Sequence, residues 1–156
     1  MVMGYFNNPK ATEEAFDSEG FLRTGDEGSI NSEGLLTIHD RIKEMIKVKG
    51  VQVAPAELED LLLGHSKIED CAVIGVPDDY SGEKPLAFVV LKPDIKAGNA
   101  VKEEVLGYVK EKKSRSKWLS GVEIVDQIPK SPSGKILRRV LRNRYSSASA
   151  TVKAKL

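Results

Sequence analysis

The sequence contains few of the residues that mark specialised classes of protein. Its 156 residues include one cysteine, Cys71, which excludes an intramolecular disulfide, and only two histidines, His39 and His65, so no zinc constellation is predicted. No apolar run approaches the roughly 20 residues that span a bilayer. The N-terminus also lacks the basic-then-apolar order of a signal peptide. We therefore expect no membrane span, no metal site and no disulfide framework.

The chain also has little excess charge of either sign. Its 24 basic and 23 acidic residues nearly cancel, which argues against a dedicated nucleic-acid binder. The local exception is a run of four arginines between residues 138 and 144. With 40% hydrophobic and 30% charged residues, the composition is that of a soluble globular protein. At 17.1 kDa the chain can form one core, or one small domain plus part of another.

Residues 1–39 are punctuated by glycine and turn-forming motifs such as NNP, SEG and NSEG. The segments FLRTGD and LLTIHD between them have the length of strands, which predicts β-hairpins. These residues contain too little apolar surface to close a core of their own. We therefore expect them to be the last strands of a domain that lies mostly outside this chain.

The pattern changes at residue 40 and predicts a compact α+β domain of about 100 residues. The segment IKEMIKVKG alternates as a half-buried strand or ribbon with its lysines outward, and APAELEDLLLGH predicts a helix with Pro55 in its first turn. CAVIGV and LAFVVL are continuous apolar strands, which indicates a sheet covered on both faces, with Cys71 in the core. A helix over AVKEEVLGYVKEKK, a strand at VEIVD and a helix over ILRRVLRNRY complete the prediction.

The segment IPKSPSGKILRR, residues 128–139, places one lysine, Lys135, after a Pro/Ser/Gly turn. It is not a P-loop, because Pro129 stands where the motif needs its first glycine and Ile136 stands where it needs serine or threonine. From the turn alone two interpretations remain open: a solvated lysine, or a lysine delivered to a substrate.

Four short motifs occur in a characteristic order: RTGD at 23–26, HDRIKEMIKVKGVQV at 39–53, APAELE at 54–59 and PKSPSGK at 129–135. Together they resemble the C-terminal part of acyl- and aryl-CoA ligases of the adenylate-forming superfamily, most closely the 4-coumarate–CoA ligase-like group. The resemblance implies an α+β fold: a small C-terminal domain with a short mixed sheet flanked by helices, preceded by a β-rich remnant of the large N-terminal domain. It assigns residues 1–39 to this remnant and residues 40–145 to the mobile C-terminal domain.

The resemblance also implies a two-step reaction that uses a carboxylic acid, ATP with Mg²⁺, and coenzyme A. The acid first attacks ATP to give an acyl-adenylate and pyrophosphate, and CoA then displaces AMP to give the acyl-CoA. Lys135 corresponds to the catalytic lysine, which stabilises the charge that gathers between carboxylate and α-phosphate during adenylation. Lys130 is a weaker candidate for this role.

Further residues are assigned by the same resemblance. Asp26 accepts hydrogen bonds from the ribose hydroxyls, and Arg41 donates near the same ribose or phosphate. Asp40 is the hinge about which the small domain swings between two poses. The ATP or AMP side also includes Lys47 and Gln52, and the CoA side includes Lys49 and Gly50. Without the resemblance, a surface salt bridge for Arg41 and a solvated strand face for Lys47 and Lys49 are the default interpretations.

The N-terminal motifs of the family, including its Ser/Thr/Gly-rich phosphate loop, are absent. We therefore expect a C-terminal fragment that is inactive alone. Two alternatives stay open: the small domain of a luciferase-like or other adenylating enzyme, and a non-catalytic domain that binds an anionic partner. The segment SKWLSG departs from the family's usual pattern and leaves the role of Trp118 open.

Residues 146–156 are predicted to be a flexible tail. The terminal triplet Ala154-Lys155-Leu156 is a variant of the S-K-L peroxisomal address. It predicts a peroxisomal protein that binds an import receptor; without the address, the protein is expected in the cytoplasm. Metabolism of phenylpropanoids or fatty acids is the expected setting.

Overall fold

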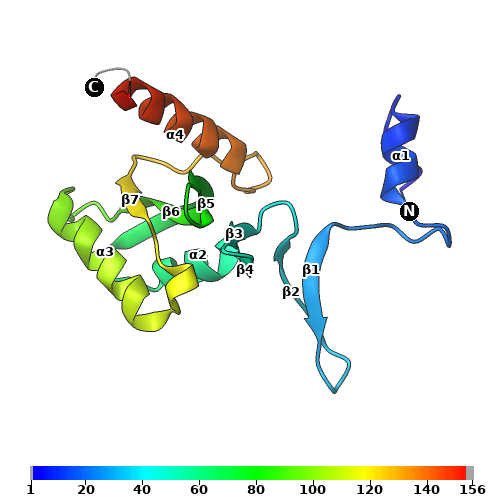
Figure 1. The fold of residues 1–156 in the computed structure, drawn as a ribbon, viewed down its shortest axis with the longest axis horizontal. Coiled ribbons are helices and arrows are strands. Elements are labelled where there is room, and N and C mark those ends of the chain that lie inside the picture. The colour runs from blue at the N-terminus through cyan, green and yellow to red at the C-terminus, as the bar shows by residue number, and fades with distance from the viewer. Residues whose placement is uncertain (1, 154–156) are drawn as a thin grey trace. The chain divides into compact units, whose positions relative to one another are not determined.

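The computed structural model describes the backbone of residues 2–153 and the side chains of residues 2–147. The chain divides into two compact units, Met1–Lys43 and Glu44–Leu156. The division falls four residues after the boundary that the sequence predicts. Figure 1 labels the helices and strands of both units.

The first unit contains one short helix and one hairpin. Helix α1 (Pro9–Ala15) begins where the Asn8 side chain accepts a 3.1 Å hydrogen bond from the Ala11 N–H. Strands β1 (Asp26–Ile30) and β2 (Leu36–Arg41) form an antiparallel hairpin, as expected, but β1 begins where the predicted strand segment FLRTGD ends. The prediction of hairpins throughout this region was wrong at α1, because NNP caps a helix here: its second asparagine is the N-cap and its proline is the first helical residue.

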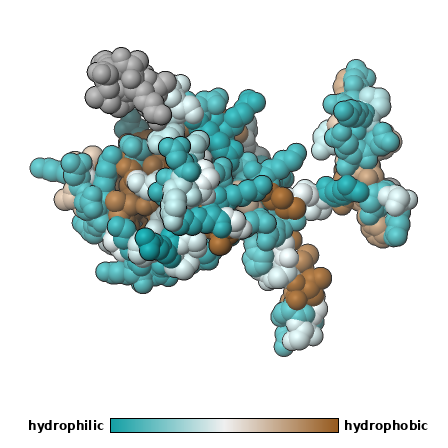
Figure 2. All heavy atoms as spheres, viewed as in Figure 1, coloured by the Kyte–Doolittle hydropathy of each residue, from teal (hydrophilic) through white to brown (hydrophobic). Residues whose placement is uncertain are grey.

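Apolar side chains of the first unit are exposed. No residue from 2 to 43 is buried, and Figure 2 shows apolar atoms gathered on the β1–β2 hairpin. Ile30 is 70% exposed and Leu36 is 62% exposed. This agrees with the expectation that the unit has too little apolar surface for a core of its own.

The second unit is a mixed sheet with helices on both faces, which confirms the predicted α+β class (Figure 1). The sheet order is β4-β3-β6-β5, with β7 parallel to β6 and the other pairs antiparallel. Its elements are β3 (Ile46–Val48), β4 (Val51–Val53), α2 (Pro55–Leu63), β5 (Ile68–Asp78), β6 (Gly82–Leu91), α3 (Asn99–Lys112), the 3-10 turn η1 (Arg115–Lys117), β7 (Gly121–Ile124) and α4 (Arg138–Lys153).

The two long strands β5 and β6 contribute to two separate hydrophobic clusters. Alternate residues point to opposite faces of a sheet. Cys71 and Val73 therefore pack in the cluster that contains Leu58 of α2 and Val105 of α3. Ala72, Ile74 and Val76, which point to the other face, pack in the cluster that contains Leu141 of α4. Both faces are thus covered, as the continuous apolar runs predict.

Three element boundaries differ from the sequence prediction. Residues 42–44 form a turn rather than the first half of a strand, and β3 is followed by a second strand, β4, across the Lys49–Gly50 turn. Helix α4 begins at Arg138, and its backbone continues to Lys153 through most of the segment predicted as a tail. The predicted address Ala154-Lys155-Leu156 lies outside the described residues. None of the helices described is long and apolar enough to cross a membrane.

Candidate functional site

Lys135 lies at the end of a tight turn that its own hydrogen bonds close. The Ser131 N–H donates to the Lys135 carbonyl at 2.8 Å, and the Lys135 N–H donates back to Ser131 Oγ at 3.1 Å. Gly134 has φ +80°, in the left-handed region that suits glycine. The Lys135 side chain is exposed and forms no ion pair within residues 2–147. The turn therefore offers this ammonium group to solvent.

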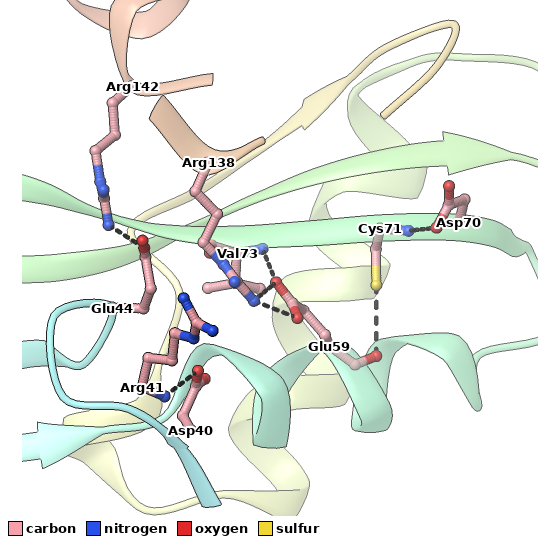
Figure 3. Close-up of polar contacts among 9 residues, drawn as sticks. All are labelled: Asp40, Arg41, Glu44, Glu59, Asp70, Cys71, Val73, Arg138 and Arg142. Carbon is pink, nitrogen blue, oxygen red and sulfur yellow. Dashed lines mark hydrogen bonds and ion pairs between the residues drawn. The ribbon is translucent and has the colours of Figure 1, made fainter. Parts of the chain in front are cut away.

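A buried ion pair anchors the chain directly after this turn (Figure 3). Arg138 Nη2 donates to both carboxylate oxygens of Glu59, at 2.9 and 2.8 Å. Glu59 Oε1 also accepts from the Val73 N–H at 2.8 Å, and Arg138 Nε donates to the Val73 carbonyl at 3.3 Å. The two side chains are only 14% and 11% exposed. The start of α4 is thus tied to α2 and β5.

Two further ion pairs hold the same region. Lys130 Nζ lies 2.6 Å from Asp70 Oδ2, at the start of β5. Arg142, one helical turn after the buried arginine, donates to Glu44 Oε2 at 2.7 Å (Figure 3). Of the two lysines on the loop, Lys130 is therefore paired and Lys135 is exposed. This difference favours Lys135 for the role that the family resemblance assigns.

The second lysine-bearing turn joins β3 to β4. Lys49 and Gly50 both have positive φ, +51° and +80°, so they form a two-residue hairpin turn of type I′ character. Lys47 and Gln52 are direct partners in the hairpin. Their side chains therefore project from the same face of the ribbon. The structure brings together all four residues that the resemblance places on the adenylate and CoA sides of this motif.

Beside this turn lies a cavity of about 500 Å³. Its wall includes two aromatic rings, Tyr80 and Trp118, and the basic side chains of Lys49, Lys110 and Arg115. The Lys49 Nζ lies 3.7 Å from the centroid of the Tyr80 ring. Backbone contact fixes the turn as well, because the Lys49 N–H donates to the Ser81 carbonyl at 2.8 Å.

The two turns are attached to opposite ends of β5. The Lys135 turn is held at Asp70 through Lys130, whereas the Lys49 turn is held at Ser81, beyond the end of the strand at Asp78. Eight residues of strand separate Asp70 from Asp78, or about 26 Å at 3.3 Å per residue. The two turns are therefore anchored at separate places in the sheet.

The first unit brings three of the predicted residues together on its hairpin. Asp26 and Arg41 are direct partners across β1 and β2, with Arg41 Nε 3.6 Å from Asp26 Oδ1. Asp40 precedes Arg41 in β2, and its Oδ1 accepts a 2.7 Å hydrogen bond from the Arg41 N–H. The Asp40 position, predicted as the hinge, lies four residues before the second unit begins.

Several residues of these sites were not found from the sequence. The Glu59–Arg138 pair was missed, although Glu59 stands four residues after Pro55 and three before Leu62, on the buried stripe of α2. Glu57, on another face of α2, forms ion pairs with Lys113 Nζ at 2.7 Å and with Lys117 Nζ at 2.6 Å. Tyr80 was not singled out at all. Only three-dimensional proximity identifies these partners.

The cysteine and the acidic side chains offer little further chemistry. Burial, with the charge of Glu59 next, raises the pKa of Cys71 to about 12, so its thiol stays protonated. Among the described residues, no group of three or more His, Cys, Asp or Glu side chains could hold a metal ion. The chemical groups that remain are the cationic turns and the aromatic cavity.

Comparison with known proteins identifies the architecture. The profile of the AMP-binding enzyme C-terminal domain family matches residues 57–135, just over half of the chain. The 4-coumarate–CoA ligase-like 9 of Oryza sativa subsp. japonica is 49% identical over 145 residues, which are 93% of this chain and 26% of that protein. The 4-coumarate–CoA ligase 1 of Glycine max is 45% identical over 148 residues, which are 95% of this chain and 50% of that protein.

A solved structure shows the same fold. The anthranilate CoA ligase AuaEII, solved in complex with anthranoyl-AMP, is 34% identical with a TM-score of 0.83, over 94% of this chain and 28% of that one. The chain thus spans only about a quarter to a half of the length of these relatives. These similarities agree with the four sequence motifs and confirm the resemblance. The chain belongs to the AMP-binding enzyme C-terminal domain family, shared with 4-coumarate–CoA ligases.

Proposed function

We propose that this chain is the C-terminal portion of an ATP-dependent acyl- or aryl-CoA ligase. The observation that carries the proposal is the attachment of two lysine-bearing turns to opposite ends of β5, one at Asp70 and one beyond Asp78. A two-step reaction on one active site needs two different groups at different times. A small domain that carries a separate cationic turn for each step can rotate so that first one turn and then the other faces the active site.

The Lys135 turn serves the first step in this proposal. The exposed ammonium group bridges an oxygen of the carboxylic acid and an oxygen of the α-phosphate, where negative charge accumulates as the acyl-adenylate forms. The hydrogen bonds within the turn limit its freedom, and the Arg138–Glu59 pair fixes the start of the helix that follows. Placement of this charge is the contribution of the chain to adenylation.

The hairpin of the first unit serves the nucleotide. The Asp26 carboxylate accepts hydrogen bonds from the two ribose hydroxyls, and Arg41, 3.6 Å from it, supplies a donor to the ribose or phosphate. Lys47 and Gln52 add polar contacts to the adenylate. Mg²⁺ accompanies ATP as its counter-ion, and no residue of this chain is assigned to it.

The Lys49–Gly50 turn serves the second step, in which CoA replaces AMP. Its lysine supplies positive charge, and Gly50 has no heavy atom within 4 Å of the position that a Cβ would take. A pantetheine chain can therefore pass close to the backbone there. Asp40, at the end of the first unit, is the proposed hinge between the two poses. The acid itself, aryl or acyl, binds outside this chain.

The assignment of Lys135 is tested in the full-length enzyme that contains this chain. Lys135→Ala should reduce pyrophosphate release in the adenylation step by about 10² to 10³, as removal of a charge-stabilising donor does elsewhere. Thioester formation from synthetic acyl-adenylate and CoA should change little. Lys96→Ala is the control: it removes an exposed lysine from the loop between β6 and α3, and it should leave adenylation near the wild-type rate. Equal losses in both steps for Lys135→Ala would refute the role.

A further inference from the structure

Ser131 stands at the base of the Lys135 turn and directly precedes Pro132. It faces Lys135 across the turn, because these two residues are the next facing pair after the isolated β-bridge between Lys130 and Ile136. The Ser131 Oγ accepts a 3.1 Å hydrogen bond from the Lys135 N–H. Side chains that face each other across an antiparallel pair project from the same side. The hydroxyl group and the lysine side chain therefore share one side of the turn.

The hydroxyl group of Ser131 is held by contacts at the protein surface. Its oxygen lies 2.9 Å from Ser133 Oγ, and the Gly134 N–H donates to the Ser131 carbonyl at 2.9 Å. Ser131 is half-buried, and residues 132–135 are all exposed. Hydrogen bonds of exposed turns open locally, without unfolding of the rest of a domain. A modifying enzyme can therefore reach this hydroxyl group while the core stays folded.

The charge of this segment suits an added anion. Residues 127–156 contain no Asp or Glu. Three carboxylates from other elements form ion pairs with this segment: Glu44 with Arg142, Glu59 with Arg138, and Asp70 with Lys130. Lys135 and Arg139 are exposed, and neither forms an ion pair among the side chains of residues 2–147. A phosphate group on the turn therefore has cations to bind.

The residues that follow the two serines of the turn distinguish them. Proline-directed protein kinases select a serine followed by proline, whose ring fixes φ and removes the backbone N–H. Ser131 has this feature, because Pro132 follows it. Ser133 precedes Gly134, which has φ +80° and no such restriction. Ser131 is also the serine whose oxygen contacts Lys135. Sequence and geometry thus favour the same hydroxyl group.

We propose that Ser131 is a phosphorylation site for a proline-directed protein kinase, and that its phosphate binds the Lys135 ammonium group. In the transfer, Ser131 Oγ bonds to the γ-phosphorus of ATP, and the bond from that phosphorus to the bridging oxygen of ADP breaks. ADP leaves, and the hydroxyl proton passes to the catalytic carboxylate of the kinase. The new group carries about −1.5 to −2 charges at pH 7.

The effect on catalysis rests on the proposed function. A Lys135 ammonium group that is bound to a phosphate on its own turn cannot stabilise the charge between the carboxylic acid and the α-phosphate. Adenylation should therefore slow. The Lys49 turn is held separately, at Ser81, so the thioester step should continue. Phosphorylation of Ser131 would stop the first step and leave the second.

The site itself is tested on the 156-residue chain. The chain is incubated with MgATP and either a mitogen-activated or a cyclin-dependent protein kinase, and the phosphorylated residue is located by tandem mass spectrometry. Ser131 should be modified in the wild type and in Ser133→Ala, whereas Pro132→Ala should lose the modification. Phosphate on Ser133 alone, or no phosphate on the turn with either kinase, would overturn the proposal.

The contact with Lys135 is tested by ³¹P NMR on the same phosphorylated chain. A free phosphoserine has a second pKa of about 6. The Lys135 ammonium group should lower the pKa of this phosphate to about 5.5 or less. Lys135→Ala should return the pKa to about 6, whereas Lys96→Ala removes an exposed lysine after β6 and should leave the pKa low. A phosphate pKa that does not respond to Lys135→Ala would refute the contact.

The effect on catalysis is measured in the full-length enzyme that contains this chain. Phosphorylation should reduce pyrophosphate release by about 10², close to the loss expected for Lys135→Ala. Thioester formation from synthetic acyl-adenylate should change little. Ser131→Ala, treated with the same kinase, should keep the rate that it had before treatment. If the phosphate binds Lys135 but adenylation is unchanged, the phosphorylation site stands and the assigned role of Lys135 fails, so the two failures are distinguishable.

Discussion

Two glutamates on helix α2 hold the two chemically distinct ends of the domain. Glu59 is buried and pairs with Arg138, which follows the Lys135 turn. Glu57 is more exposed and pairs with Lys113 and Lys117, which flank the wall of the aromatic cavity. Two residues of helix correspond to a rotation of about 200°, so neighbouring carboxylates of one helix reach opposite sides of the fold.

The difference between the two anchors is one of burial and geometry. Arg138 binds both oxygens of Glu59 through a planar group, and the Val73 N–H satisfies the carboxylate further. Glu57 instead binds two flexible ammonium groups at the surface. A buried carboxylate leaves an uncompensated cation when it is removed, whereas a surface carboxylate is largely screened by water. The Lys135 turn is therefore expected to depend on its glutamate far more than the cavity wall does.

The largest effect is expected from Glu59→Ala. The change leaves Arg138 and the Val73 N–H buried without their acceptor, which should lower the free energy of unfolding by about 3–5 kcal/mol. Urea denaturation followed by far-UV circular dichroism measures this loss. Glu103→Ala on the exposed side of α3 is the control and should change stability by less than about 0.5 kcal/mol.

A paired variant tests whether the loss comes from the unpaired charge. Glu59→Gln combined with Arg138→Met removes both charges and keeps a polar acceptor near the Val73 N–H. It should recover at least half of the stability that Glu59→Ala loses, because the stranded cation is absent. A double variant less stable than Glu59→Ala would show that packing, rather than charge, dominates at this anchor.

The contrast between the anchors also shows what local sequence patterns can predict. The continuous runs CAVIGV and LAFVVL predicted two strands covered on both faces, because burial on both sides leaves no polar alternation. The helix over α2 followed from its apolar stripe and from Pro55. The partner of Glu59 could not be predicted in this way, since Arg138 is 79 residues away in the chain. An acidic residue within an apolar stripe was the available signal.

The sequence prediction also failed at two turns, the one between β3 and β4 and the one before α1. The alternation of IKEMIKVKG predicted a strand or ribbon over its whole length, but residues 42–44 form a turn, and the left-handed Lys49 and Gly50 join β3 to β4 in a hairpin. The NNP motif was interpreted as a turn, although asparagine before proline also caps a helix. Tyr80 and Trp118 line one cavity only because the β5–β6 turn and η1 meet in space.

An intermediate effect is expected from the glycines of the two lysine-bearing turns. Gly50 and Gly134 both have φ +80° and no heavy atom within 4 Å of the position that an alanine Cβ would take, so the only cost of alanine is conformational. Gly50→Ala and Gly134→Ala should each lose about 1–2 kcal/mol. Gly107→Ala, inside α3 and equally unobstructed, should instead gain about 0.5–1 kcal/mol.

Thermal unfolding of the three glycine variants sharpens the comparison. Equal losses at Gly50 and Gly134 would show that the turns are built alike and that the difference between the two ends lies in their anchors. A loss at Gly134 well below that at Gly50 would contradict the hydrogen-bonded geometry of the Lys135 turn, since an unrestrained loop absorbs alanine at little cost.

The smallest effect is expected from Glu57→Gln, and it should depend on pH. Burial alone would raise the pKa of Glu57, but hydrogen bonds from Lys113 and Lys117 outweigh it and hold the pKa below the ordinary 4.5. A carboxyl with a lowered pKa stabilises the fold above its unfolded pKa, and this contribution is lost as pH falls through the folded value. The wild type should therefore be more stable than Glu57→Gln by less than about 1 kcal/mol at pH 7, after allowance for solvent screening. The free energies of unfolding of the two proteins should approach each other as the pH falls below 4.5 and through the lowered pKa of the folded state. Urea titrations at pH 7 and at pH 3 measure the difference, and a gap that stays constant between them would mean that Glu57 acts through packing instead of charge.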